Sequence, residues 1–155
     1  KTEQRELDDT DRRLIGLLQK DGRISNTDLA RRLGISEATV RLRLKKLIDG
    51  DVIQIVGVCN PFKIGFGITG DLYIHVDMRK TASVIDELVK FKELWYIVMT
   101  TGQATINAEF VVGSLGELND LVYNRLSVID GIARIETSII TKYIKRRYDF
   151  GTGSG

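Results

Sequence analysis

The chain has 155 residues, a net charge of only +2 and 43% hydrophobic residues, which allows one large or two small domains with a packed core. Its single cysteine, Cys59, excludes an internal disulfide and a cysteine-cluster metal site. No apolar run reaches the length that spans a membrane, and no signal-peptide pattern opens the chain. We therefore expect a cytoplasmic protein without a membrane partner.

Charge is distributed unevenly along the sequence. Residues 23–46 carry seven basic side chains and two acidic ones, whereas residues 61–155 carry eleven of each. A basic segment of this kind favours a polyanionic partner. The first part of the chain is therefore the candidate region for nucleic-acid binding.

The first predicted element is a helix that begins at Asp8. Asp8 is a suitable N-cap residue, and the acids that follow it favour the positive end of the helix dipole. Lys20-Asp21-Gly22 ends the helix. Its apolar stripe consists of Leu14, Ile15, Leu17 and Leu18.

Two short helices joined by a tight turn follow. Ser25 caps the first, Gly34 stands where a left-handed residue is needed, and Ser36 caps the second. Two helices so close in sequence must cross, which is typical of a helix-turn-helix. With the first helix they predict a tri-helical, winged helix-turn-helix head.

The second helix of the pair, residues 36–49, has two different faces. The face expected to pack on the core carries Val40, Leu44, Leu47 and Ile48. The opposite face is basic apart from Leu42, an apolar side chain that can contact a thymine methyl in a major groove. An ordinary solvated basic helix with one stray leucine is the alternative, but the glycine turn and both caps favour DNA binding.

These faces define the candidate DNA contacts. We expect Thr39, Leu42 and Lys46 to reach base edges. Cations set the register on the phosphates, and here these are Arg23, Arg31, Arg41, Arg43 and Lys45. The remaining candidates are Thr27, Ser36, Glu37 and Ala38.

The segment between the two halves reads as a strand and a linker. The β-branched residues 52–58 predict a strand that forms the wing, and Asn60-Pro61 predicts a turn. Residues 65–70 match the dinucleotide pattern G-x-G-x-x-G, which requires a strand before it and a helix after it. A strand pattern follows instead, so we interpret the glycine-rich residues 62–70 as a linker.

The second half alternates strand and helix patterns. We expect helices in residues 84–91 and 115–126, and strands in residues 71–78, 95–100, 105–112 and 133–144. This βαββαβ order is ferredoxin-like and leaves one face of the sheet without helices. We expect that face, with Tyr73, Ile140 and Ile144, to pair with a second copy of the chain.

Catalytic chemistry has little support in the sequence. The only histidine, His75, has no accompanying cysteine, histidine or carboxylate pattern that would make a metal site or a nucleophile-base pair. We interpret it as a surface or interface residue. No catalytic residue, metal or cofactor is therefore expected.

Several motifs together are similar to those of one protein family. They are Leu7-Asp8-x-x-Asp11-Arg12, residues 18–26, Leu29-Ala30-x-x-Leu33-Gly34-Ile35-Ser36, residues 43–47, Gly102, Asp130-Gly131-Ile132 and Thr137. On these residues the chain resembles the Lrp/AsnC (leucine-responsive/asparagine-responsive, or feast/famine) family of prokaryotic transcription regulators.

The resemblance implies an α+β protein with a helix-turn-helix DNA-binding domain in residues 1–58 and a linker in residues 59–70. A ferredoxin-like effector-binding and oligomerisation domain is implied in residues 71–150, and residues 151–155 form a tail. It implies sequence-specific binding of double-stranded DNA, homodimers that assemble into tetramers or octamers, and control by a small molecule such as an amino acid. It also makes residues 36–49 the recognition helix, with Arg43 matching the family's arginine.

The resemblance places the effector site at Gly102, Gln103, Ala104 and Thr105. The family usually has Gly-Asp-x-Asp in this turn, so the chain lacks both acids that would meet an ammonium group. Either the ligand differs or the turn binds none, and Asn107 and Glu109 are alternative polar contacts in the next strand. Two rival functions are an architectural DNA-binding protein that needs no effector and a small-molecule-binding metabolic enzyme domain.

Overall fold

The computed structural model describes residues 6–146, which divide into two compact units. The first unit contains the residues up to Val58 and, from the far end of the chain, Lys145 and Arg146. The second runs from Cys59 to Ile144. The tail proposed for residues 151–155 lies outside the described residues.

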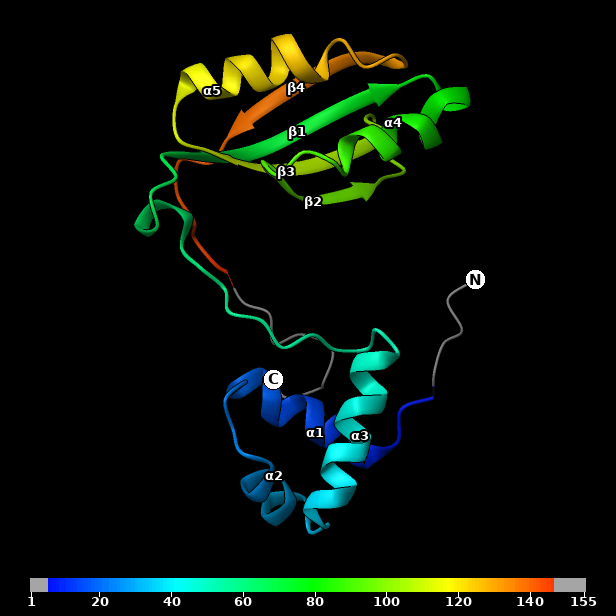
Figure 1. The fold of residues 1–155 in the computed structure, drawn as a ribbon, viewed down its shortest axis with the longest axis vertical. Coiled ribbons are helices and arrows are strands. Elements are labelled where there is room, and N and C mark those ends of the chain that lie inside the picture. The colour runs from blue at the N-terminus through cyan, green and yellow to red at the C-terminus, as the bar shows by residue number, and fades with distance from the viewer. Residues whose placement is uncertain (1–5, 147–155) are drawn as a thin grey trace. The chain divides into compact units, whose positions relative to one another are not determined.

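The first unit is a bundle of three helices. They are α1 (Asp9–Lys20), α2 (Asn26–Leu33) and α3 (Glu37–Asp49) (Figure 1). The predicted N-caps Asp8, Ser25 and Ser36 are confirmed, since each side chain accepts a hydrogen bond from a backbone N–H in the first turn of its helix. The bundle is held by side chains that all three helices bury completely, namely Leu14, Leu29, Val40 and Leu47.

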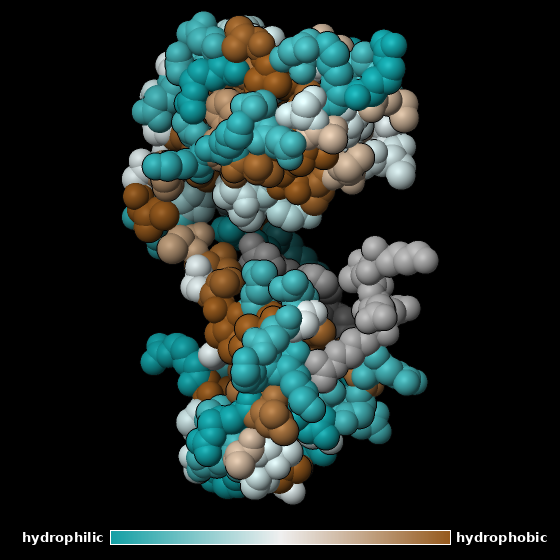
Figure 2. All heavy atoms as spheres, turned by 45° about the vertical axis from the view of Figure 1, so that its right-hand side comes forward, coloured by the Kyte–Doolittle hydropathy of each residue, from teal (hydrophilic) through white to brown (hydrophobic). Residues whose placement is uncertain are grey.

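Two expectations for this unit were wrong. Ile48 is 44% exposed and does not join the core, because it lies in the last turn of α3, whereas Leu44 still packs there. Residues 52–58 belong to no strand, because the described part of the chain offers them no pairing partner. Ile55, Val56 and Val58 in this segment are exposed. Figure 2 shows hydrophobic surface, in brown, along the stretch of chain that joins the two units.

The second unit is a four-stranded antiparallel sheet with the order β2-β3-β1-β4. The strands are β1 (Ile68–Val76), β2 (Leu94–Met99), β3 (Ile106–Val112) and β4 (Ile132–Ile139). The helices are α4 (Thr81–Leu88) and α5 (Leu115–Asn119), the latter continued by a π-helical segment, Asp120–Leu126. This is the βαββαβ, ferredoxin-like fold that the sequence predicted.

Both helices lie on one face of the sheet (Figure 1). β3 shows the consequence most clearly, since Ile106, Ala108, Phe110 and Val112 are buried beneath the helices and the residues between them are only partly covered. The opposite face, which we call the open face, presents Tyr96 on β2, Asn107 and Glu109 on β3, Asp71, Tyr73 and His75 on β1, and Arg134 and Glu136 on β4.

The ends of the elements differ from the predictions in several places. β1 begins at Ile68, inside the expected linker, because Ile68 pairs with Val112 and the Thr69 hydroxyl donates to the Phe110 carbonyl at 2.8 Å. Pro61–Lys63 forms a short 3-10 helix. Met78 lies beyond β1 in a second one, Met78–Lys80, whose first turn is capped by Asp77. β4 ends at Ile139 rather than residue 144, near the start of β1, where the Ile140 N–H still donates to the Thr69 carbonyl at 2.9 Å.

Candidate functional site

The turn between α2 and α3 fixes how these helices cross. Gly34 takes the left-handed conformation (φ 71°, ψ 33°), which only glycine adopts without strain. The next residue, Ile35, donates its N–H to the Ala30 carbonyl at 3.1 Å, and Ser36 then starts α3. α3 therefore follows α2 after three residues, the geometry of a helix-turn-helix.

A side-chain contact strengthens this crossing. The Thr27 hydroxyl donates to Glu37 Oε1 at 2.7 Å and so joins the first turns of α2 and α3. Ser36 Oγ accepts from the Thr39 N–H at 3.1 Å and lies 2.8 Å from Thr39 Oγ1. Four of the candidate DNA contacts therefore form two hydrogen-bonded pairs, Thr27 with Glu37 and Ser36 with Thr39.

The outward face of α3 is basic with an apolar centre. Ala38, Arg41, Lys45 and Lys46 are exposed, and Leu42 between them is 55% exposed. Lys45 pairs with Asp49 at 2.6 Å and Arg41 with Glu37 at 3.6 Å. Arg31 on α2 pairs with Asp28 at 2.5 Å, and Arg23 precedes α2 on the exposed surface. Exposed pairs of this kind contribute little to stability, so a phosphate can replace the carboxylate.

Arg43 does not share this outward face. Its Nη1 donates to Asp8 Oδ2 at 2.7 Å and to Asp11 Oδ1 at 2.8 Å, and Asp11 is only 4% exposed. The guanidinium therefore joins α3 to the first turn of α1, where the sequence had suggested a phosphate contact. The Asp11 N–H and then the Arg43 guanidinium lower the pKa of Asp8, and both carboxylates raise the pKa of Arg43.

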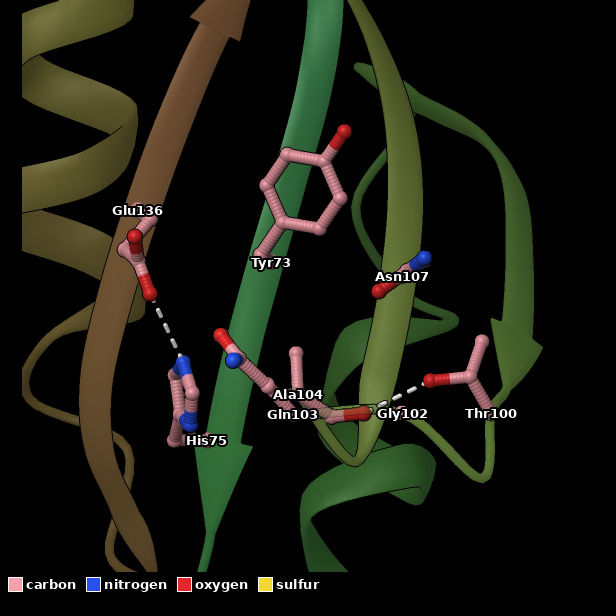
Figure 3. Close-up of a pocket in the computed structure, with 8 residues that line it drawn as sticks. All are labelled: Tyr73, His75, Thr100, Gly102, Gln103, Ala104, Asn107 and Glu136. Atoms are coloured by element: carbon pink, nitrogen blue, oxygen red, sulfur yellow. Dashed lines mark hydrogen bonds and ion pairs between the residues drawn. The ribbon is translucent and has the colours of Figure 1, made fainter.

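A pocket of about 410 Å³ opens on the sheet of the second unit. It lies on the open face, where β1, β3 and β4 meet the turn between β2 and β3 (Figure 3). Its lining residues are Tyr73, His75, Thr100, Gly102, Gln103, Ala104, Asn107 and Glu136.

Hydrogen bonds from one threonine hold the turn at the pocket's edge. Thr100 donates its hydroxyl to the Ala104 carbonyl at 2.6 Å and its N–H to the Thr105 carbonyl at 2.9 Å. Gln103 extends from this turn toward His75 (Figure 3). Three of the four candidate effector residues, Gly102, Gln103 and Ala104, thus line the pocket, whereas Thr105 lies outside the lining and closes the turn.

The floor of the pocket is a row of side chains from three neighbouring strands. Tyr73 on β1 is the register partner of Asn107 on β3 and of Glu136 on β4. Glu136 Oε1 lies 2.9 Å from His75 Nε2 and 3.3 Å from Arg134 Nη2. Asn107 differs from them, because its Oδ1 is buried and accepts no hydrogen bond within residues 6–146.

Sequence reasoning missed half of this pocket. Tyr73, His75, Thr100 and Glu136 were not among the candidate effector residues, and Glu109, offered as an alternative contact, does not line it. The alternation of residues 71–77 places Tyr73 and His75 on one face, which was a usable signal. Glu136 could be added only from the pairing of β4 with β1. No group of three or more histidine, cysteine or acidic side chains in the described residues is placed to hold a metal ion.

Comparison with known proteins gives the same division of the chain. Residues 7–48 match the AsnC-type helix-turn-helix domain, and residues 72–150 match the Lrp/AsnC ligand binding domain. The HTH-type transcriptional regulator PH0140 of Pyrococcus horikoshii is 36% identical over 144 residues, which cover 92% of this chain and 91% of that protein. Within the described residues, no helix is long and apolar enough to cross a membrane.

Solved structures share the fold. Escherichia coli AsnC superposes with a TM-score of 0.81 at 23% identity, covering 93% of this chain and 98% of that one. The regulator NMB0573 of Neisseria meningitidis, in complex with L-Met, gives 0.80 at 21% identity and covers 96% and 98%. The chain therefore belongs to the Lrp/AsnC family of transcriptional regulators, with a helix-turn-helix DNA-binding domain followed by a ligand-binding domain.

Proposed function

We propose that this regulator binds specific DNA sequences by placing the outward face of α3 in the major groove. The observation that carries the proposal is Leu42, a 55% exposed leucine at the centre of an otherwise cationic helix face. In that position an apolar side chain is unfavourable in water and suits a thymine methyl. Thr39 and Lys46 flank it and complete the set proposed for base edges.

The remaining contacts are proposed to be with phosphates. Arg23, Arg31, Arg41 and Lys45 are exposed, and the acids paired with three of them are at least partly exposed. Thr27, Ser36, Glu37 and Ala38 set the start of α3 against the DNA backbone. We leave Arg43 out of this set, because its guanidinium is bound by Asp8 and Asp11.

The test is fluorescence anisotropy with a random-sequence duplex over a series of salt concentrations, followed by selection of a preferred duplex. Each phosphate contact contributes about −0.9 to the slope of log K against log salt, so several contacts give a steep fall. Absence of binding at low salt, both without and with candidate effectors, would exclude α3 as the groove-reading helix. Equal binding to selected and random duplexes would favour an architectural protein instead.

Leu42→Ala tests the base contact. We expect it to lower discrimination between the selected and random duplexes by about three- to tenfold, with little change on random DNA. Ile48→Ala is the matched control, because Ile48 is an exposed apolar residue of α3 on a different face. Discrimination that survives Leu42→Ala would place the groove contact elsewhere.

The pocket on the open face is proposed as the effector site. Gly102, Gln103 and Ala104 line it, and Thr105 positions the turn through its carbonyl. The similar NMB0573 is in complex with L-Met, which supports an amino-acid-like effector for this fold. Regulation then requires that the effector bind two states of the protein with different affinities.

We also infer a cytoplasmic homodimer formed through the open face, with dimers joining into tetramers or octamers. Exposed aromatic side chains on that face support a protein partner. A two-fold axis would present two heads to a palindromic site.

The proposed domain bounds remain residues 1–58 for the head, 59–70 for the linker and 71–150 for the effector domain. No catalytic activity is assigned.

A further inference from the structure

We propose that the segment after β4 adds a second DNA-binding surface to the head, in which Lys145 and Arg146 contact backbone phosphates. This surface is separate from α3, and phosphate contacts add affinity for any duplex without reading its sequence. The inference rests on the proposed DNA binding by the head.

The chain after β4 runs back along the beginning of the second unit. The Ile140 N–H donates to the Thr69 carbonyl at 2.9 Å, and three residues later the centre of the Tyr143 ring lies 6.1 Å from that of the Phe62 ring. Each step forward from β4 therefore meets an earlier residue of the chain, in the direction of Cys59, where the second unit begins (Figure 1). This direction explains how the far end of the chain returns to the first unit.

Lys145 and Arg146 belong to the head. They group with the residues up to Val58, whereas residues 59–144 form the second unit. Lys145 is exposed, Arg146 is partly exposed, and the preceding Ile144 is 85% exposed. Because this stretch is part of no helix or strand and leaves even an isoleucine in water, its cations lie on the surface of the head.

The helical part of the head has little net charge of its own. Residues 6–58 carry ten basic and nine acidic side chains, a net charge of +1, and one of these cations, Arg43, is bound by acids of the first helical turn. Lys145 and Arg146 raise the net charge of the described head to +3, and residues 140–146 contain no acid. The segment therefore supplies much of the positive charge that attracts a polyanion.

An acidic protein surface is the other class of partner that a basic segment can bind. The grouping of Lys145 and Arg146 with the helix-turn-helix favours DNA. A helix that enters the major groove brings the phosphates of both strands close to the unit that carries it, so cations of the same unit meet phosphates first.

The experiment measures duplex binding by the chain of residues 1–155, using fluorescence anisotropy over a series of salt concentrations. For Lys145→Gln/Arg146→Gln, we expect the slope of log K against log salt to become less steep by about 2, since each phosphate contributes about 0.9. Affinity is expected to fall by the same factor on selected and random duplexes, so discrimination stays unchanged. Lys145→Arg keeps the cation and is expected to match wild type.

Lys90→Gln/Lys92→Gln is the matched control. It removes the same charge from two exposed lysines that follow α4 in the second unit, and its salt slope is expected to equal that of wild type. The single variant Lys145→Gln separates binding from stability. Because Lys145 is exposed, the melting temperature is expected to stay unchanged while the slope falls by about 1.

The outcomes are distinguishable. If wild type binds no duplex at low salt, with or without candidate effectors, the proposed function and the second surface both fail. If wild type binds DNA and Lys145→Gln keeps the same slope, the role of α3 stands and the second surface is wrong. Equal losses of slope in Lys145→Gln/Arg146→Gln and in the lysine control would attribute the effect to net charge, which also contradicts the proposal.

Discussion

Arg43 shows how a basic residue of a recognition helix can serve the fold. It contacts Asp8 and Asp11 of the first helical turn, whereas Lys45, two residues further along α3, pairs with Asp49 on the surface. The two cations are indistinguishable in the sequence pattern, which counted both as phosphate contacts. Only the packing of α1 against α3 separates them.

Arg43→Gln is expected to lower the stability of the head and to leave its electrostatic attraction for DNA unchanged. Losing the cation leaves the carboxylate of Asp11, 4% exposed, without its ionic partner, which lowers the free energy of unfolding by about 1–2 kcal/mol. Lys45→Gln is the control and is expected to leave stability unchanged but reduce the salt slope by about 1. Thermal unfolding and salt-dependent anisotropy measure the two effects.

Acidification gives a second check on the same ion pair. The pKa of Asp8 is lowered in the folded state, so its contribution is complete above the unfolded value near 3.8 and disappears as pH falls through the lowered value. The difference in melting temperature between wild type and Arg43→Gln is therefore expected to shrink below about pH 4. An Arg43→Gln protein with normal stability and a reduced salt slope would instead make Arg43 a phosphate contact.

The pocket was predictable only in part, because contacts between residues distant in the chain depend on how the elements pack. Gly102, Gln103 and Ala104 follow one another in the chain, so a resemblance could locate them together. Glu136 lies more than thirty residues later and reaches the pocket only because β4 pairs with β1. Asn107 was noticed as a polar strand residue, but its unbonded oxygen is a property of the packed structure.

At the scale of the elements, helix starts that carry a capping side chain were predictable and strand ends were not. The helix expected in residues 84–91 is α4, Thr81–Leu88, and its earlier start was missed because the N-cap residue Lys80 makes no side-chain cap hydrogen bond. Asp8, Ser25, Ser36 and Ser114 cap their helices through residues three positions away, so the signal is local. A strand ends where its neighbour ends, and the neighbour is distant in sequence. The predicted ends of β1 and β4 were therefore wrong by several residues. A strand was also predicted for residues 52–58, which form none.

Gly70 shows why the start of β1 was hard to predict from the sequence. Glycine weakens strands, so the sequence favoured a linker, yet Gly70 is buried inside β1 and pairs with Phe110 and Ile139. A Cβ there would lie 2.0 Å from the Ser138 carbonyl oxygen and 2.9 Å from the Phe110 ring. The glycine is required by the close approach of β4 and of a core aromatic side chain.

Gly70→Ala is accordingly expected to destabilise the second unit by roughly 2–4 kcal/mol, since backbone and core must both move to admit one methyl group. Gly57→Ala is the control, because a Cβ at Gly57 meets nothing within 4 Å. Urea unfolding followed by Trp95 fluorescence, a probe on β2, measures the change. Equal midpoints for the two variants would mean that the sheet accommodates the methyl group at Gly70.

At the scale of the whole molecule, the two units present different surfaces. The head presents exposed cations on α2 and α3 among others, and the second unit leaves one face of its sheet without helices. A single head offers few phosphate and base contacts, so high sequence discrimination requires a second head on the same DNA. The proposed dimer through the open face would therefore link the fold of the second unit to the specificity of the first.

Tyr96→Arg tests this link. Tyr96 lies on edge strand β2, 48% exposed on the open face opposite Glu109, so an arginine there would oppose a second copy stacked on the sheet. Tyr123→Arg is the matched control, because Tyr123 is 70% exposed on the π-helical segment that covers the other face. By light scattering during size exclusion, we expect the Tyr96 variant to lose dimer mass and the Tyr123 variant to keep it.

DNA binding gives the second measurement. On a duplex with two half-sites, the Tyr96 variant is expected to bind no more tightly than on one half-site. If its mass and its preference for paired half-sites match wild type, the dimer forms through another surface.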